Sequence, residues 1–505
     1  MATSIQVDMF EVQLGAALLL QFGTSGGKPV RVLADAGIKA SGYPEDHVRK
    51  KLPGAFKDFA PGKARIDLII GTHYDEDHLS GLAPIIADPA WAIGEAWLPP
   101  VLNDEAPAAP RRRGARPVAP ATLAQQLAGE NAAGILSDYL KRKADLCEML
   151  LQLEDAAAPA RRARRGATRS LPTYPAARRG AAPAAAQLDT YFRAQLTDAR
   201  AALHEVDATH ADEPAQQVPV SAAGAVRRGR ANAPVLAATY TAIRKAEAAK
   251  AINAMALAEV VNACVKRGVP IRCEMIPDGV PVAYKWSAAS KRFVKGKAAA
   301  KDLGLVLLGP SQGLANKHAE LLPVAQYARR GLRGAIAVKS ITPSNQLSYV
   351  ARFTHAGQHL LVTGDAGCVD WSTAPRKPYH KALLNELKGP LHVVQVAHHG
   401  GNNAHFYNVL LAADYAAQQG DSYLLLSHAT NDKTRPSTEF RAFVEEVKHA
   451  RTGMRLLFTS KPKAANAKGL KPYTAPTKGA KGTVGDVRLV HAAGTWSVAR
   501  HAVQL

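Results

Sequence analysis

Four potential metal ligands crowd one short turn, His73–His78, in the stretch THYDEDHLSG. The turn follows the apolar run RIDLIIG, which is typical of a strand buried on both faces, and it precedes a short helical pattern. A turn at the carboxyl end of a strand can direct alternate side chains into one cleft. We therefore expect His73 and Asp75 to bind one metal ion, and Asp77 and His78 a second. The alternative is a solvated acidic loop whose aspartate caps the helix.

Further candidate residues stand at the ends of other apolar strands. Asp365 lies in LLVTGDAG and His398 in VVQVAHHGG. Ligands gather at strand ends in open α/β architectures, so we expect both residues to join the first cluster. His399 and His428 occupy similar positions, but a histidine in such a position is more often a hydrogen-bonded structural residue than a metal ligand. Asp35, in VLADAG, could orient a ligand histidine or simply close a turn.

These segments together resemble a known family. THYDEDHLSG is similar to the H-x-H-x-D-H motif of the metallo-β-lactamase fold, in the variant H-x-D-x-D-H. With VLADAG, LLVTGDAG, VAHHGG and LLLSH, it resembles the metallo-β-lactamase-like domain of the ComEC type, found in DNA-uptake proteins and their stand-alone soluble relatives. The resemblance covers roughly residues 5–102 and 255–460. It implies an α/β fold, the metallo-β-lactamase αββα sandwich, with a large, basic, mainly helical insertion.

The resemblance also implies a ligand set. It assigns Asp365 as a metal-bridging carboxylate and His398 as a ligand of the second ion, beside the ligands His73, Asp75, Asp77 and His78. Two features depart from the family pattern. The third-motif histidine has no clear counterpart, since SNQLSYVARF offers only Asn345 and Ser348. Where the family tends to show His-Pro after the last strand, this chain has Arg435-Pro436.

The donor set predicts hydrolytic metal chemistry. We expect two bound divalent metal ions, zinc or manganese. An aspartate at position 75 makes the site oxygen-rich, which shifts its preference toward manganese without excluding zinc. Such ions lower the pKa of a bridging water and clamp a phosphodiester for in-line attack. We assign Asp77 to orienting or deprotonating that water as well as to binding metal. Lys433, Arg435 and His428 are candidates for contacting substrate, with an ordinary surface cation as the alternative for the first two. His399 is a candidate for supporting the ligands.

The composition is that of a folded protein with a basic balance. The chain has 505 residues, of which 47% are hydrophobic and 21% charged, so wholesale disorder, a collagen-like repeat and a disulfide-stapled miniprotein are excluded. The charge difference, 64 − 42 = +22, favours a polyanionic partner, and nucleic acid is the partner we expect. The four cysteines form no C-x-x-C pair, and no targeting or membrane segment is visible, so we expect a cytoplasmic location and no membrane partner.

The middle of the chain differs from the rest in composition. It is rich in alanine, proline and arginine, with the basic clusters PRRRGARP, ARRARRGATR and AVRRGRANAP. Apolar residues at helical spacing, among them Leu188, Phe192 and Leu203, predict helices joined by arginine-rich loops. Those loops could contact nucleic acid, although a GC-rich genome produces the same composition. We expect a domain in two parts, residues 1–102 and 256–460, separated by an insertion over residues 103–255. Residues 461–505 are expected to form a basic loop and a β-like tail.

Apolar runs elsewhere predict the elements of the α/β domain. A short helix is expected over 79–88. Strands are expected over 5–22, 29–37, 65–71, 95–100, 303–309, 349–355, 359–364, 392–397 and 422–427.

We expect a metal-dependent hydrolase, most directly a phosphodiesterase or nuclease acting on DNA or RNA. One alternative is hydrolysis of a small ester, lactone or thioester, because a single fold hosts many chemistries. Another is a module with a weak or structural metal site, in which the insertion docks a regulatory protein partner and gates the cleft.

Overall fold

The computed structural model forms two compact units, one of which carries both sheets and the other a set of long helices. The first takes in Met1–Ala128, Ala256–Ala319 and Pro343–Leu505, and the second Gly129–Met255. The described residues are 5–24, 27–38, 47–60, 64–103, 121–157, 171, 174, 185–209, 233–319, 343–372, 378–470, 475–477, 479 and 482–505. The arginines of the three basic clusters lie outside these ranges.

The first sheet has eight strands in the order β16-β15-β1-β2-β3-β4-β5-β6. The strands from β3 to β6 are parallel neighbours, whereas β16, β15, β1, β2 and β3 pair antiparallel. The strands are β1 (Ile5–Met9), β2 (Leu18–Gly23), β3 (Pro29–Ala34), β4 (Arg65–Ile70), β5 (Ala92–Trp97), β6 (Ile271–Arg272), β15 (Val487–Ala492) and β16 (Thr495–Arg500).

The second sheet also has eight strands, in the order β14-β13-β12-β11-β10-β9-β7-β8. Its strands from β11 to β14 are parallel, and the others pair antiparallel, so both sheets are mixed. The strands are β7 (Val282–Ser287), β8 (Arg292–Lys295), β9 (Gly304–Gly309), β10 (Val350–His355), β11 (Gln358–Val362), β12 (Val393–Gln395), β13 (Ser422–Leu426) and β14 (Met454–Phe458).

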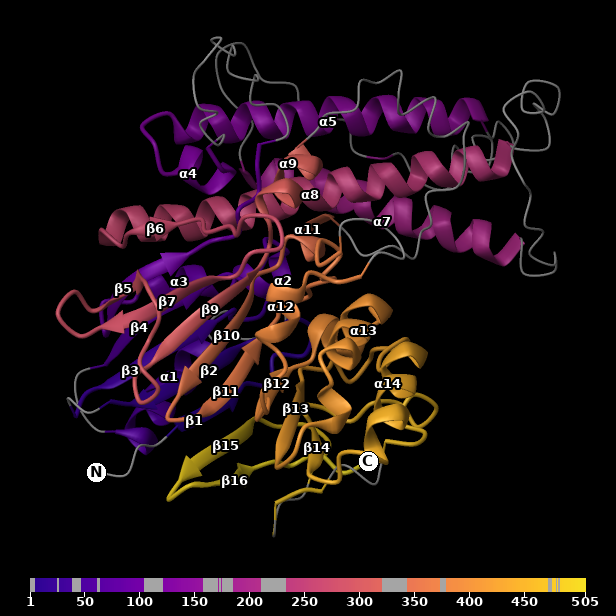
Figure 1. The fold of residues 1–505 in the computed structure, drawn as a ribbon. Helices are drawn as coiled ribbons and strands as arrows, with labels where there is room; N and C mark the ends of the chain where they lie inside the picture. Colours follow the sequence, from indigo (N-terminus) through magenta and orange to yellow (C-terminus); the bar gives the residue numbers. More distant parts are fainter. Residues whose placement is uncertain are drawn as a thin grey trace. The chain divides into compact units, whose positions relative to one another are not determined.

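The two sheets pack face to face around an apolar core. The rings of Phe22 and Phe353, one from each sheet, have centroids 5.9 Å apart, and those of Trp97 and Tyr284 are 4.9 Å apart. Side chains from both sheets belong to one continuous buried cluster. The unit is therefore mixed α/β, as expected from the sequence (Figure 1).

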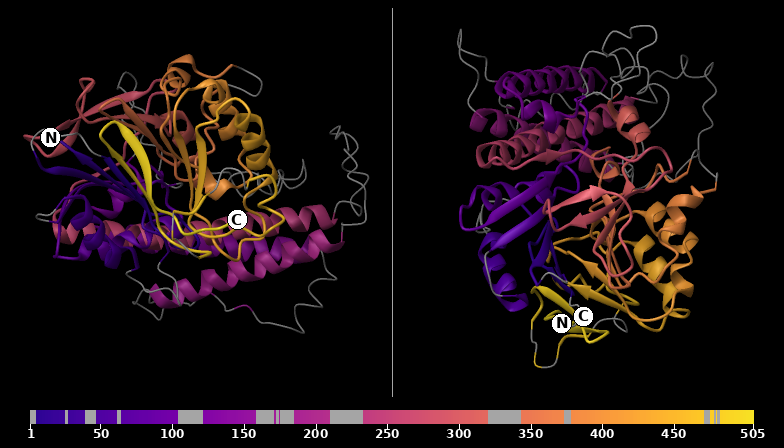
Figure 2. Two further views of the ribbon diagram at one scale, coloured as in Figure 1. Left: turned by 90° about the horizontal axis from the view of Figure 1, so that it is seen from below. Right: turned by 60° about the vertical axis from the view of Figure 1, so that its left-hand side comes forward.

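Helices cover the outer faces of this pair of sheets (Figure 2). On the first sheet, the Ala55 carbonyl of α1 accepts a hydrogen bond from Gln21 Nε2, and Arg31 lies over the Phe56 ring. On the second, Leu426 of β13 and Phe440 of α14 both lie next to Gly400, which follows β12. The helices of this unit are α1 (His47–Phe59), α2 (Glu76–Leu79), α3 (Leu82–Ala87), α4 (Leu123–Leu127), α9 (Gln312–Ala319), α11 (Pro343–Gln346), α12 (Lys381–Asn385), α13 (Ala404–Ala412) and α14 (Thr438–Lys448), with 3-10 turns η1 (Ala397–Gly400) and η2 (Tyr415–Ala417).

The amino-terminal strand prediction was wrong in one respect. Residues 5–22 form two strands, β1 and β2, which pair antiparallel with Ile5 opposite Phe22. The chain reverses between them at Gln13 and Gly15, whose φ angles of 59° and 95° favour a turn over an extended strand. The other expected strands are present as β3, β4, β5 and β9 to β13, and the expected helix at 79–88 is present as α3.

The second unit is built from long helices. These are α5 (Ala132–Ala157), α7 (Ala185–Thr209) and the first part of α8 (Ala233–Arg267). Leu188, Phe192 and Leu203, which predict a helix from their spacing, lie on α7 and are buried. Most described residues of the expected insertion are therefore helical, but the first unit extends to Ala128, well past the expected boundary at residue 103.

One helix among the described residues, Ala237–Arg267, is long and apolar enough to cross a membrane by length and composition alone. Most of it is buried within the protein, which is also the pattern of a core helix, so it is weak support for a membrane span.

Candidate metal centre

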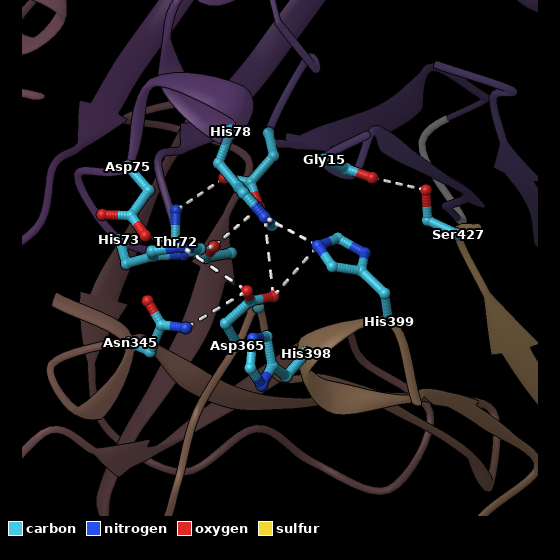
Figure 3. A network of polar contacts seen from close by, with 12 residues as sticks. Gly15, Thr72, His73, Asp75, His78, Asn345, Asp365, His398, His399 and Ser427 are labelled. Atoms are coloured by element: carbon cyan, nitrogen blue, oxygen red, sulfur yellow. Dashed lines mark hydrogen bonds and ion pairs between the residues drawn. The ribbon is translucent and has the colours of Figure 1, made fainter. Parts of the chain in front are cut away.

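The expected ligands meet where parallel strands of both sheets end (Figure 3). In the first sheet, Asp35 follows β3 and His73 follows β4, while His78 lies in α2 directly after the same turn. In the second sheet, Asp365 follows β11 and His399 lies in η1 after β12. All five of these side chains are buried. Polar groups from segments far apart in sequence therefore converge on one buried place.

Asp35 holds the orientation of His78. Its carboxylate accepts hydrogen bonds from the Thr72 amide at 2.7 Å, from the Thr72 hydroxyl at 2.6 Å and from His78 Nδ1 at 2.8 Å. When the ring is neutral with its proton on Nδ1, as this hydrogen bond favours, the lone pair of His78 Nε2 is directed away from Asp35 and toward Asp365. This carboxylate–histidine pairing is the arrangement that commonly orients a metal-binding imidazole.

Thr72 orients His73 in a similar way. The Thr72 hydroxyl gives its only hydrogen to Asp35, so its oxygen accepts from His73 Nδ1, 3.1 Å away. The proton is thereby placed on Nδ1, and Nε2 keeps a lone pair. His73 Nε2 is buried without a hydrogen-bond partner, 3.7 Å from Asp75 Oδ2 and 3.9 Å from Asp365 Oδ2.

Asp365 lies among three imidazoles. Its Oδ1 is 3.5 Å from His78 Nε2 and 3.6 Å from His399 Nε2, and these two nitrogens are 3.3 Å apart. Oδ1 has no hydrogen-bond partner, whereas Oδ2 is 3.5 Å from Asn345 Nδ2. Two ligands at about 2.0–2.2 Å from a shared tetrahedral ion lie about 3.3–3.6 Å apart, so these separations suit a bound cation.

The electrostatics of the cluster also favour a cation. Burial alone would lower the pKa of His78, but the carboxylates of Asp365 and Asp35 raise it to about 10. Burial would raise the pKa of Asp365, but the surrounding histidines hold it below its usual range. Burial lowers the pKa of His399 to about 3 and that of His73 well below its usual value, so both imidazoles are neutral near pH 7 and keep the lone pairs that a metal requires.

Asp75 and Asp77 lie on the more open side of the cluster. Asp75 occupies the position before α2 where a capping residue would sit, but its side chain makes no capping hydrogen bond. Burial, and after it the electrostatic effect of the Asp77 carboxylate, raises the pKa of Asp75 to about 7. The alternative of a solvated loop with a capping aspartate is therefore wrong, because the histidines are fully buried and the aspartate does not cap.

The donors of the cluster could hold a metal ion. Two sets of three side chains have ligand atoms within 4.8 Å of one another. They are Asp35, His73 and His78, and Asp77, His78 and His399. Since Asp35 already accepts three hydrogen bonds, we regard it as the residue that orients His78, and Asp365 as the carboxylate facing the imidazoles.

The two consecutive histidines exchange the positions expected for them. His399, expected to support the ligands, has its Nε2 within the cluster, whereas His398 Nε2 lies 2.8 Å from the Arg435 guanidinium. His398 Nδ1 is buried without a hydrogen-bond partner. Both residues have a φ of 54°, a left-handed conformation that the spacing of the motif does not reveal.

The three residues expected to contact substrate have different surroundings. His428 is buried, and its ring nitrogens are each 3.0 Å from an oxygen, Nδ1 from the Ser460 hydroxyl and Nε2 from the Arg435 carbonyl. It therefore has no ring nitrogen left for a substrate and has a structural role instead. Arg435 contacts His398 and forms an ion pair with Asp432 at 2.9 Å, while Lys433 is exposed.

Sequence reasoning missed Thr72 and Gly15. Thr72 precedes His73, and a small polar residue there is the only signal that could have identified it. A Cβ on Gly15 would lie 1.7 Å from the Asp77 carbonyl oxygen, so only glycine lets the β1–β2 turn approach the ligand turn this closely. The Ser427 hydroxyl donates to the Gly15 carbonyl from the other sheet (Figure 3).

Comparison with known proteins does not identify a family for this chain. Neither a protein-family model nor a curated protein matches the chain.

Proposed function

We propose that this chain is a metal-dependent hydrolase of the metallo-β-lactamase fold, of the ComEC-like kind, and that it cleaves phosphodiester bonds in nucleic acid. The observation that carries the proposal is the convergence of His73, His78 and His399 Nε2 on the buried Asp365 carboxylate. Two mixed sheets packed face to face, with helices on their outer faces, support the fold assignment.

The residues of the cluster have distinct roles in this proposal. His73, His78, His399 and Asp365 would hold a first divalent ion, with Asp75 and Asp77 available to a second. When bound, such ions supply a water of lowered pKa and positive charge for a phosphate oxygen. The Asp77 carboxylate, less buried than the histidines, would orient the attacking water and accept its proton. Asp35 and Thr72 keep the two imidazoles in the tautomer that offers Nε2.

The proposal is tested by a cleavage assay with manganese on single- and double-stranded DNA and RNA. Wild type and Asp77→Ala are compared with Glu76→Ala, which removes the neighbouring carboxylate of the same helix from outside both ligand sets. We expect cleavage by wild type and Glu76→Ala, and a loss of at least about a hundredfold in Asp77→Ala at unchanged circular dichroism. Full turnover by Asp77→Ala would contradict the mechanism.

Hydrolysis of a small ester, lactone or thioester is the second candidate. The net charge of +22 favours the polyanionic substrate instead. The two differ in salt dependence, because nucleic-acid binding releases counterions. Between about 50 and about 200 mM salt, nuclease activity below saturation should fall steeply, whereas turnover of a neutral ester should stay nearly constant.

A further inference from the structure

The segment that follows the last parallel strand lies on the same sheet edge as the metal centre. β11, β12, β13 and β14 are parallel neighbours, so their carboxyl ends share one edge. Asp365 and His399 follow the first two of these strands. Residues 427–437 follow the third and residues 459–470 the fourth, so both are brought to the edge that carries the cluster.

Arg435 connects these two segments with the cluster. Its carbonyl oxygen accepts hydrogen bonds from His428 Nε2 and from Asn466 Nδ2, each at 3.0 Å. Its guanidinium lies 2.8 Å from Nε2 of His398, the residue next to His399. A second anchor is the hydrogen bond at 3.0 Å from the Arg441 guanidinium to the Ala465 carbonyl. The position of residues 461–470 beside the metal centre is thus held by specific contacts.

This part of the chain has a one-sided charge. Residues 456–485 contain six lysines and no aspartate or glutamate. Three of these lysines, Lys461, Lys463 and Lys468, are described and exposed, as is Lys433 in the neighbouring loop. We call these four residues the basic edge. The lysines of residues 456–485 have no acidic residue within their own segment, so they repel one another, and a bound polyanion would relieve that repulsion.

We propose that the basic edge binds the phosphodiester backbone of a nucleic-acid strand and guides it to the metal centre, an inference that rests on the proposed nuclease function. Lysine ammonium groups contact phosphates as point charges, so binding is independent of sequence and depends strongly on salt. The basic edge thereby gives the chain affinity for a polymer that the buried cluster alone would not have.

The test measures binding of a fluorescent oligothymidylate to the full chain by anisotropy, in EDTA so that no cleavage occurs. The variant is Lys461→Ala/Lys463→Ala/Lys468→Ala. The control is Lys285→Ala/Lys295→Ala/Lys297→Ala, which removes three exposed lysines from the β7–β8 region at the opposite end of the strand order. We expect the variant to lose affinity by about tenfold or more, and its log–log salt slope to become shallower by about 2, since each phosphate contact contributes about 0.7. The control should keep the wild-type values.

Equal affinities and salt slopes for the two triple variants would overturn the inference. The inference would also be overturned if binding to phosphatidylserine vesicles depended on these lysines while binding of oligothymidylate did not. Manganese-dependent hydrolysis of bis(p-nitrophenyl) phosphate, a diester too small to need the basic edge, is measured in parallel. If the wild type does not hydrolyse it while the lysine variant loses oligothymidylate binding, the proposed function fails, and of the inference only strand binding by the basic edge stands. If the diester is hydrolysed and oligothymidylate binding by the lysine variant is unchanged, only the inference fails.

Discussion

The orientation of two imidazoles depends on a single buried carboxylate, that of Asp35. It accepts directly from His78, and it takes the hydroxyl hydrogen of Thr72, which leaves the Thr72 oxygen to accept from His73. In Asp35→Asn the amide offers one acceptor oxygen instead of two. We expect the affinity for Mn²⁺, measured by isothermal titration calorimetry, to fall about ten- to a hundredfold.

Asp302→Asn, the same change at an exposed aspartate, is the control and should bind manganese like the wild type. Circular dichroism establishes that both variants are folded. Wild-type affinity in a folded Asp35→Asn protein would show that Asp35 does not orient the ligands.

Gly15 tests whether the β1–β2 turn positions the ligand turn. In Gly15→Ala, the new methyl group would overlap the Asp77 carbonyl oxygen, at a φ of 95° that alanine adopts poorly. We expect a loss of about 3 kcal/mol or more in the free energy of unfolding by urea, because close backbone contact and conformational strain add. Gly27→Ala, at a φ of 73° with nothing within 4 Å, bears only the strain and should lose about 1–2 kcal/mol. Equal losses would contradict the proposed close contact.

At the level of single residues, the type and spacing of polar groups after apolar strands predicted most of the cluster. His73, His78 and Asp365 were expected and do lie together. The order of His398 and His399 could not be predicted, because the direction of each side chain depends on a left-handed backbone. The role of His428 was undecided for a related reason: its partners, Ser460 and Arg435, are distant in sequence.

At the level of elements, continuous apolar runs predicted buried strands, because strands covered on both faces need no alternation. At residues 5–22 the two strands were not separated, because only a short turn joins the alternating apolar and polar residues of β1 to the apolar run of β2. β7 and β8 were not expected. Each has a single buried residue, Tyr284 or Phe293, among partly buried and exposed ones, and their apolar pattern is correspondingly weak.

In the helical unit, a buried arginine joins α5, α7 and α8. Arg244 is fully buried and pairs with Glu154 at 2.9 Å and with Asp198 at 2.8 Å. In Arg244→Met, the Glu154 carboxylate stays buried without its cation, so we expect the unfolding free energy from urea titrations to fall by about 3–5 kcal/mol. Arg193→Met breaks an exposed pair on α7 and should cost less than about 1 kcal/mol. A small effect of Arg244→Met would contradict this account, because it would mean that water already reaches the Glu154 carboxylate in the folded protein.

At the level of the whole molecule, the pairing of distant segments could not be predicted. β1 at the amino terminus lies beside β15 near the carboxyl terminus, with Ile5 opposite His491. β6 extends the first sheet after residues Gly129–Met255 of the helical unit have intervened. The periodicity of apolar residues indicates local conformation only. Which strands pair with one another depends instead on the burial of both faces of the completed sheets.

Several histidines of the sandwich are neutral when folded, which makes stability depend on pH. His359 and His392 stack with ring centroids 6.1 Å apart, and burial first, then nearby arginines, lowers the pKa of each to about 4. Between about pH 6.5 and pH 4 the unfolded chain therefore binds more protons than the folded one, so the free energy of unfolding should fall as the pH is lowered and level off below about pH 4.

Urea titrations across this range measure the effect. His392→Asn keeps a side-chain acceptor for the His359 amide but cannot titrate, and it should show a shallower decline than wild type. A wild-type unfolding free energy that stays constant over the range would contradict this account.

The central claim, that the buried cluster is a divalent metal site, is tested most directly by titrating Mn²⁺ into the protein and following the free ion by electron paramagnetic resonance. Asp365→Asn removes the charge that faces His78 and His399, while Glu76→Ala is the matched loss of a carboxylate outside the ligand sets. The account predicts that wild type and Glu76→Ala deplete the free-ion signal and that folded Asp365→Asn does so at least about tenfold more weakly. Equal depletion by all three proteins, or none by the wild type, would contradict it.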